Sequence, residues 1–95
     1  MPTFTFKIDL INTEPLVSRT INVSSETTLY LMYHIIQAVL GWENRHLYEF
    51  SINNLRFADS RLVDEEFGNF TDVKMVLLED VFSKTGTKAT YLYDF

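Results

Sequence analysis

The side chains able to do chemistry are few and widely spaced in this 95-residue chain. Four of them are candidates for a ligand pocket: Arg19, His34, His46 and Asp94. Arg19 shares one face of an alternating segment with apolar neighbours, and a charge there is costly unless it is paired. We favour a solvent-facing position at a bulge or strand edge, or an ion pair with an acidic neighbour, over contact with a ligand. If the four side chains instead converge, the chain is part of a ligand-binding or enzymatic domain.

The two histidines do not by themselves indicate a metal site, because a catalytic metal usually takes three protein ligands. His34 shares a helical ridge with Tyr30 and Gln37, which indicates a solvated helix face or, less favoured, a polar triplet that binds a ligand. His46 fits a packed, hydrogen-bonded strand residue better than a ligand. The acidic run 64–66 is consecutive, so its side chains diverge, and we interpret it as solvated charge.

No catalytic signature appears in the sequence. The absence of cysteine excludes thiolate catalysis, iron–sulfur clusters and cysteine-based zinc sites. The sequence contains no HExxH, GxSxG, Walker or GxGxxG motif, and three glycines are too few for a phosphate-cradling loop. We therefore predict no catalytic residue, no metal and no cofactor.

The composition indicates a folded domain and disfavours nucleic acid and membranes as partners. Hydrophobic residues make up 46% of the chain and aromatic residues 15%, which favours a folded domain over disorder. The net charge of −5 opposes a phosphate backbone, so we do not expect binding to nucleic acid. The first ten residues lack the pattern of a signal peptide, and no apolar run reaches the ~20 residues of a membrane-spanning helix. We expect a cytoplasmic protein with no membrane contact.

Hydrophobic periodicity predicts alternating strands and two helices. In chain order the elements are strands over 3–10 and 17–23, a helix over 26–41, strands over 46–52 and 55–57, a short strand over 74–76, a short helix over 77–82 and a last strand over 88–95. Ser24 or Ser25 is the expected N-cap of the long helix, and Gly41 its stop. Asn53 and Asn54 tolerate positive φ and predict a tight turn between two strands.

This order predicts one α+β domain over residues 1–95. We expect a mixed sheet of about five strands with one long helix across a face, as in a β-grasp arrangement, and one short helix. Residues 58–70 read as an irregular acidic loop held down by its hydrophobic side chains.

The long helix carries more apolar surface than one small core needs. One face is sufficient to cover a sheet: Leu29, Met32, Tyr33, Ile36, Val39 and Leu40. Leu31, Ile35 and Ala38 form a second stripe, which either the loop over 60–70 or another protein surface covers. The last strand places Ala89, Tyr91, Tyr93 and Phe95 on one face, and an aromatic strand at a sheet edge is a template for pairing.

These two surfaces favour a non-enzymatic interaction module with a protein partner. Self-association, with a dimer first, or docking to another protein would use Leu31, Ile35 and Ala38 together with Tyr91, Tyr93 and Phe95.

Three segments carry a resemblance to a known family: FTFKIDL followed by EPLVSRTINV, TTLYLMYHIIQAVLGWENRHLYEFSI, and KATYLYDF. In this order and spacing they resemble the plasmid pRiA4b ORF-3-like proteins, also labelled insertion-element passenger or TnpR-like proteins. The most specific positions are Thr28, Leu29, Ile36 and Gln37, with the later run of Gly41, Trp42, His46, Leu47 and Phe50.

The chain also departs from the family pattern. Ser18 and Thr20 flank Arg19 where the family has Trp and Arg, and Tyr33 and Tyr48 stand where it has histidine. The family's Tyr-Asp-Phe is normally followed by Gly-Asp and then by Trp and His, so the resemblance implies that a C-terminal part is missing after Phe95. The resemblance implies no established biochemical activity, and its label adds a mobile-element accessory role as a further alternative.

Overall fold

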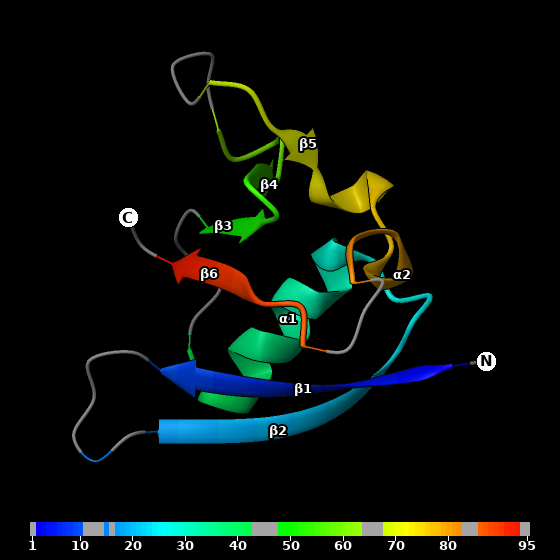
Figure 1. The fold of residues 1–95 in the computed structure, drawn as a ribbon. Helices are drawn as coiled ribbons and strands as arrows, with labels where there is room; N and C mark the ends of the chain where they lie inside the picture. Colours follow the sequence, from blue (N-terminus) through cyan, green and yellow to red (C-terminus); the bar gives the residue numbers. More distant parts are fainter. Residues whose placement is uncertain are drawn as a thin grey trace.

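The computed structural model describes residues 2–10, 15, 17–42, 48–63, 68–82 and 86–93 (Figure 1). Its elements in chain order are β1 Thr3–Leu10, β2 Val17–Ser24, α1 Leu29–Leu40, β3 Tyr48–Ile52, β4 Leu55–Ala58, β5 Thr71–Asp72, the 3₁₀ helix η2 Val73–Met75, α2 Leu78–Val81 and β6 Ala89–Tyr93. The fold is α+β, as predicted from the alternation of strand and helix patterns.

Strands β1 and β2, which match the strands predicted over 3–10 and 17–23, form an antiparallel hairpin. Their register runs from Thr3 opposite Ser24 to Leu10 opposite Val17. Phe4, Phe6 and Ile8 are half-buried on one face while the residues between them are exposed, because successive strand side chains point to opposite faces.

Helix α1 begins later than the sequence predicts. Its N-cap is Thr28, whose side chain accepts a hydrogen bond from the Leu31 backbone N–H at 3.1 Å, so the expected cap at Ser24 or Ser25 is wrong. The physical reason is a non-local contact: Thr28 forms an extended bridge with Leu77, and Leu29 N–H donates to the Val76 carbonyl. The predicted stop is correct, because Gly41 adopts φ 72°, a left-handed conformation that glycine reaches without strain.

The second hairpin, β3–β4, turns at Asn53 and Asn54 with φ 52° and 67°, as predicted. Strand β4 also pairs in parallel with β5, and β3 pairs antiparallel with β6, giving the order β5-β4-β3-β6. The expected single sheet of about five strands is therefore wrong: the described residues form a two-stranded and a four-stranded sheet.

The expected short strand over 74–76 is replaced by a turn of helix. Residues Val73–Met75 form η2, and the strand pairing falls earlier in the chain, in β5, which begins three residues before the expected strand. The Asp72 side chain accepts a hydrogen bond from the Lys74 N–H at 3.0 Å, which caps this turn and ends the strand. The short helix predicted over 77–82 is present as α2.

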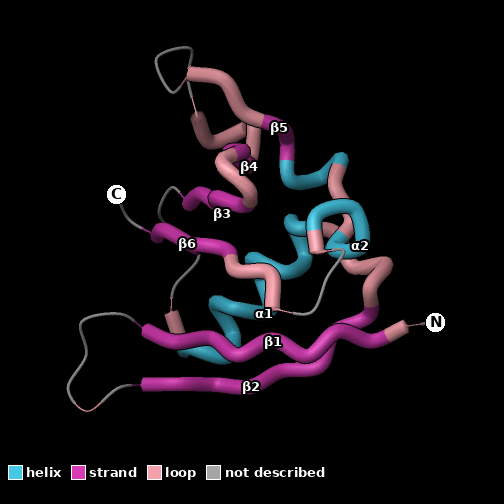
Figure 2. Tube along the Cα trace, in the orientation of Figure 1, coloured by secondary structure: helices cyan, strands magenta, loops and turns pink. Residues whose placement is uncertain are grey.

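One hydrophobic core joins the two sheets. Its buried members come from β2, α1, β3, β4, the η2 segment and α2: Val23, Leu29, Met32, Tyr33, Ile36, Tyr48, Phe50, Ile52, Phe57, Val73, Val76 and Leu78. In Figure 2 the hairpin and the four-stranded sheet appear at opposite ends, with α1 passing between them in this view. Phe6 of β1 contacts Phe82 after α2 edge to face, with ring centroids 4.9 Å apart. Among the described residues, neither α1 nor any other helix has the length and hydropathy that crossing a bilayer requires.

Candidate functional site

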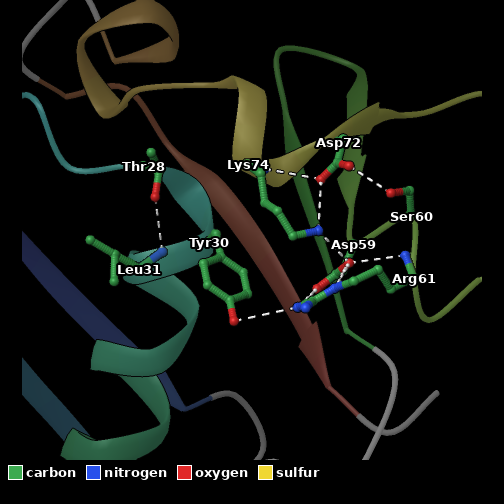
Figure 3. A network of polar contacts seen from close by, with 8 residues as sticks. All are labelled: Thr28, Tyr30, Leu31, Asp59, Ser60, Arg61, Asp72 and Lys74. Atoms are coloured by element: carbon green, nitrogen blue, oxygen red, sulfur yellow. Dashed lines mark hydrogen bonds and ion pairs between the residues drawn. The ribbon is translucent and has the colours of Figure 1, made fainter.

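The most developed polar site is centred on Asp59, directly after β4 (Figure 3). Its side chain is only 2% exposed and accepts hydrogen bonds from Arg61 N–H at 3.0 Å, Arg61 Nη2 at 2.9 Å and Lys74 Nζ at 2.8 Å. Lys74 also lies 3.6 Å from Asp72, which accepts a hydrogen bond from the Ser60 hydroxyl. We call these five residues the Asp59 network.

The charges of the network hold each other in the ionised form. Burial by itself would raise the pKa of Asp59, but hydrogen bonds from Arg61 and Lys74 outweigh it and hold that pKa well below its usual range. The hydrogen bond from Ser60 similarly lowers the pKa of Asp72, and the bond to Asp59 raises the pKa of Arg61. Asp59, Asp72 and Arg61 are therefore held in their charged forms at neutral pH.

Tyr30 of α1 covers the cationic side of this network. The Arg61 guanidinium carbon and Lys74 Nζ lie 5.4 and 5.6 Å from the centre of the Tyr30 ring, within the range of cation–π attraction. Arg61 Nη2 also donates to the Tyr30 hydroxyl at 3.4 Å. Tyr30 thus connects α1 to residues after β4 and in η2.

The interpretation of Tyr30, His34 and Gln37 as a solvated ridge is wrong: Gln37 is buried, and Tyr30 and His34 are both half-buried. Gln37 is 1% exposed, and its side-chain oxygen accepts a hydrogen bond from the Tyr91 hydroxyl at 2.8 Å. Tyr30 is half-buried against the Asp59 network. The ridge faces the four-stranded sheet because α1 presents Gln37 to β6, a placement that helical spacing cannot reveal.

A stack of tyrosines lies beside the network. Tyr48 of β3 is 1% exposed, and its ring lies parallel to that of Tyr33 with centroids 3.8 Å apart. The Tyr48 hydroxyl is buried and has no hydrogen-bond partner among the described residues. Burial, and then the nearby Asp59 carboxylate, raise the pKa of Tyr48, so the hydroxyl keeps its proton at any physiological pH.

Of the four residues predicted for a pocket, two are described. Arg19 lies opposite Ile8 on the hairpin but is exposed, and its guanidinium donates to the Ser18 carbonyl, which agrees with the favoured solvent-facing position. His34 is half-buried against the rings of Tyr30 and Tyr33. His46 and Asp94 lie outside the described residues.

The residues predicted for interaction are divided between solvent and core. Leu31 is 51% exposed and Ala38 is exposed, whereas Ile35 is partly buried against the core. Tyr91 of β6 points into the core, where its ring lies 5.0 Å from that of Phe50. The side chain of Tyr93 and the whole of Phe95 lie outside the described residues.

No group of three or more histidine or acidic side chains able to hold a metal occurs in the described part of the chain. Sequence reasoning missed Asp59 because it interpreted residues 58–70 as an irregular acidic loop held down by its hydrophobic side chains. The available signal was local: Asp59 comes two residues after the predicted strand over 55–57, directly behind the apolar Phe57 and Ala58.

Comparisons with known proteins give family and fold. The profile of the family described as plasmid pRiA4b ORF-3-like protein matches residues 2–95. The uncharacterised protein y4hQ of Sinorhizobium fredii is 38% identical over 91 residues, which is 94% of this chain and 45% of that protein. The crystal structure of MM3350, a protein of unknown function from Methanosarcina mazei Go1, matches with a TM-score of 0.85 and 28% identity over 98% of this chain and 53% of that one. The chain thus spans about half the length of these relatives, and it belongs to the plasmid pRiA4b ORF-3-like family.

Proposed function

We propose that the chain is a non-enzymatic interaction module that forms a homodimer through the exposed side of α1. The observation that carries this proposal is that α1, LYLMYHIIQAVL, contains no charged residue on any face, although Leu31 is 51% exposed. A surface helix normally carries charge on its solvent side, and a helix that is apolar all round is normally buried.

The absence of Lys, Arg, Asp and Glu from α1 allows a second copy to occupy this surface despite the like net charges of the two chains. Each chain has a net charge of −5, so two copies repel through most of their surfaces. The uncharged ridge formed by Leu31, Ile35 and Ala38 allows two helices to approach without like charges facing each other, and the small Ala38 side chain favours close packing.

The outer edge of β6 is the second surface in the proposal. Among the described strands, β6 is hydrogen-bonded to β3 alone and is therefore an edge strand of its sheet. The backbone along such an edge can pair with a further strand from a partner. The two-residue turn at Asn53 and Asn54 makes Ile52 and Leu55 the hydrogen-bonded pair next to the turn. The backbone N–H and C=O of Ile52 therefore point toward β4, and Ile52 and Ala89 are opposed without hydrogen bonds between them. The N–H and C=O of Ala89 then point away from β3, toward the side where a partner strand would pair.

The test is Leu31→Glu, with Met75→Glu as its matched control. Leu31 is the third helical residue after Thr28, so a glutamate there completes a capping box and lies at the positive end of the helix. These gains offset the loss of the apolar contacts made by the buried half of the Leu31 side chain. We therefore expect the free energy of unfolding of the monomer to change by less than about 1 kcal/mol. Burying a leucine contributes about 1.5–3 kcal/mol, so losing the exposed half on each of two copies should raise the dimer Kd roughly 10- to 100-fold.

Sedimentation equilibrium over a range of concentrations measures this Kd. Met75 is 78% exposed in η2, outside the proposed interface, and its substitution changes the net charge by the same amount. The proposal fails if the wild-type chain is monomeric at every concentration, or if the two variants dissociate alike. If a longer form of the protein is monomeric and a further part of its chain covers Leu31, the ridge serves packing within one chain and not dimerisation.

A further inference from the structure

His34 lies on the side of α1 through which the chain is proposed to dimerise. It follows Leu31 by three residues and precedes Ala38 by four, so the three side chains are neighbours on the helix surface. Leu31 and Ala38 are exposed, and His34 is half-buried. A second copy that packs on Leu31 and Ala38 therefore also covers the exposed part of the His34 imidazole.

His34 is the residue of α1 whose side chain can change its charge near neutral pH. The helix, LYLMYHIIQAVL, contains no Lys, Arg, Asp or Glu. Histidine has an ordinary pKa of about 6.5, so small changes of pH or surroundings change its charge. The surface on which the proposed dimer depends is thus free of charge only while His34 is neutral.

The contacts of His34 provide no negative charge to hold a proton. Its ring centroid lies 4.8 Å from those of Tyr30 and Tyr33, and no described carboxylate forms an ion pair with it. Both tyrosines belong to α1 and contact the imidazole within one chain. Their contacts are therefore the same in the monomer and in the dimer, and they do not favour protonation in either.

The elements packed against these two tyrosines carry no surplus of negative charge. Arg61 and Lys74 lie over the Tyr30 ring, and the two aspartates of the Asp59 network offset their charges. Tyr48 of β3 stacks on Tyr33, and burial raises its pKa, so it stays neutral. A proton on His34 is therefore an uncompensated charge at the proposed interface.

We propose that protonation of His34 opens the homodimer, so that the α1 interface forms at neutral pH and dissociates in mildly acidic solution. This inference rests on the proposed dimer. Each protonated copy brings an unpaired charge into the interface, and removing such a charge from water is costly. The neutral form is the one that dimerises, so the dimer loses stability as the pH falls through the range in which the free chain gains the proton.

The expected effect is large because each dimer contains two copies of His34. If both must lose a proton to associate, a group with the ordinary pKa of about 6.5 raises the Kd roughly 100-fold between pH 7.5 and pH 5.5.

Net charge acts in the opposite direction. Protonating both histidines of the chain reduces its net negative charge by two and weakens the repulsion between copies. Sodium chloride at about 0.5 M screens this long-range repulsion, whereas it screens a buried charge much less.

Sedimentation equilibrium in this salt, at pH 7.5 and pH 5.5, tests the inference on wild type, His34→Gln and His46→Gln. Glutamine is uncharged at both pH values, and His46 is the other histidine of the sequence. The Kd of wild type and of His46→Gln should rise roughly 100-fold at pH 5.5, whereas that of His34→Gln should change less than about threefold. A dimer of His34→Gln at pH 5.5 also shows that the fold survives this pH.

An NMR titration of the wild-type His34 imidazole provides a second measurement. The midpoint of the titration should move to higher pH as the protein is diluted into monomers, because the monomer leaves the imidazolium in water. A midpoint that does not depend on concentration, a wild-type Kd that is equal at both pH values, or an equal rise for His34→Gln would overturn the inference and leave the dimer standing. A wild-type chain that is monomeric at pH 7.5 would overturn the dimer and this inference with it.

Discussion

Replacing Asp59 by asparagine should expose how much the fold depends on the Asp59 network. The substitution keeps the shape of the side chain but removes the charge that Arg61 and Lys74 share. Removing one partner of a buried ion pair typically costs 3–5 kcal/mol. Arg61 and Lys74 both reach solvent, so we expect a smaller loss, about 2–3 kcal/mol, which lowers the melting temperature of a chain this size by ~10–20 °C.

The effect should also depend on pH, with a sign that follows from the pKa of Asp59. Because this pKa is lower in the folded chain than its ordinary value of 3.8, the ionised carboxylate stabilises the fold fully above that value. The contribution is lost as the pH falls below 3.8 toward the folded pKa. The difference in free energy of unfolding between wild type and Asp59→Asn should therefore be largest at pH 7 and shrink at pH 3.

Urea denaturation at the two pH values measures this difference. Asp9→Asn is the matched control: Asp9 is exposed, accepts a hydrogen bond from Ser18 and lies 3.8 Å from Lys7, so its loss should cost less than about 1 kcal/mol. Wild-type stability in Asp59→Asn at pH 7, or a difference that stays constant down to pH 3, would refute the reasoning.

Two further substitutions test the ends of α1. Thr28→Ala removes the hydrogen bond to Leu31 N–H and should lower the free energy of unfolding by ~1 kcal/mol, measured by urea denaturation, whereas Thr28→Ser should restore it. Gly41→Ala should cost about 1 kcal/mol in the same assay. A methyl group at Gly41 meets no atom within 4 Å, so the loss would come from the left-handed backbone, and Gly41→Asn should lose less. Equal stability of Gly41→Ala and wild type would contradict the C-cap assignment.

Local patterns predicted the elements of this fold well. The alternation over 3–10, the paired asparagines and Gly41 each act within a few residues, and each prediction is confirmed. The start of α1 was missed because residue Thr28 is held extended by Leu77, almost fifty positions away along the chain. No periodicity encodes such a bridge.

The sheet arrangement and the polar site depend on tertiary contacts that the sequence does not display. The apolar faces of the β1–β2 hairpin and of the four-stranded sheet both pack against α1, and this packing decides whether β1 pairs with β6 or stays separate. The alternation of apolar and polar residues along each strand is the same in both cases, so it cannot distinguish one sheet from two. Gln37 looks like a solvent residue until Tyr91 is placed against it. Asp59 likewise gains Lys74 only after β5 brings η2 beside β4.

The separation of the two sheets has a consequence for how the chain opens. Among the described strands, β1 and β2 pair only with each other, so side-chain burial rather than a backbone ladder attaches the hairpin to the rest of the core. Hydrophobic attachment weakens on cooling, whereas the hydrogen bonds inside each hairpin do not depend on it. The β1–β2 hairpin is thus built to undock as one cooperative unit, a foldon whose amides exchange through partial opening while the four-stranded sheet stays closed, and near-freezing temperatures favour that opening.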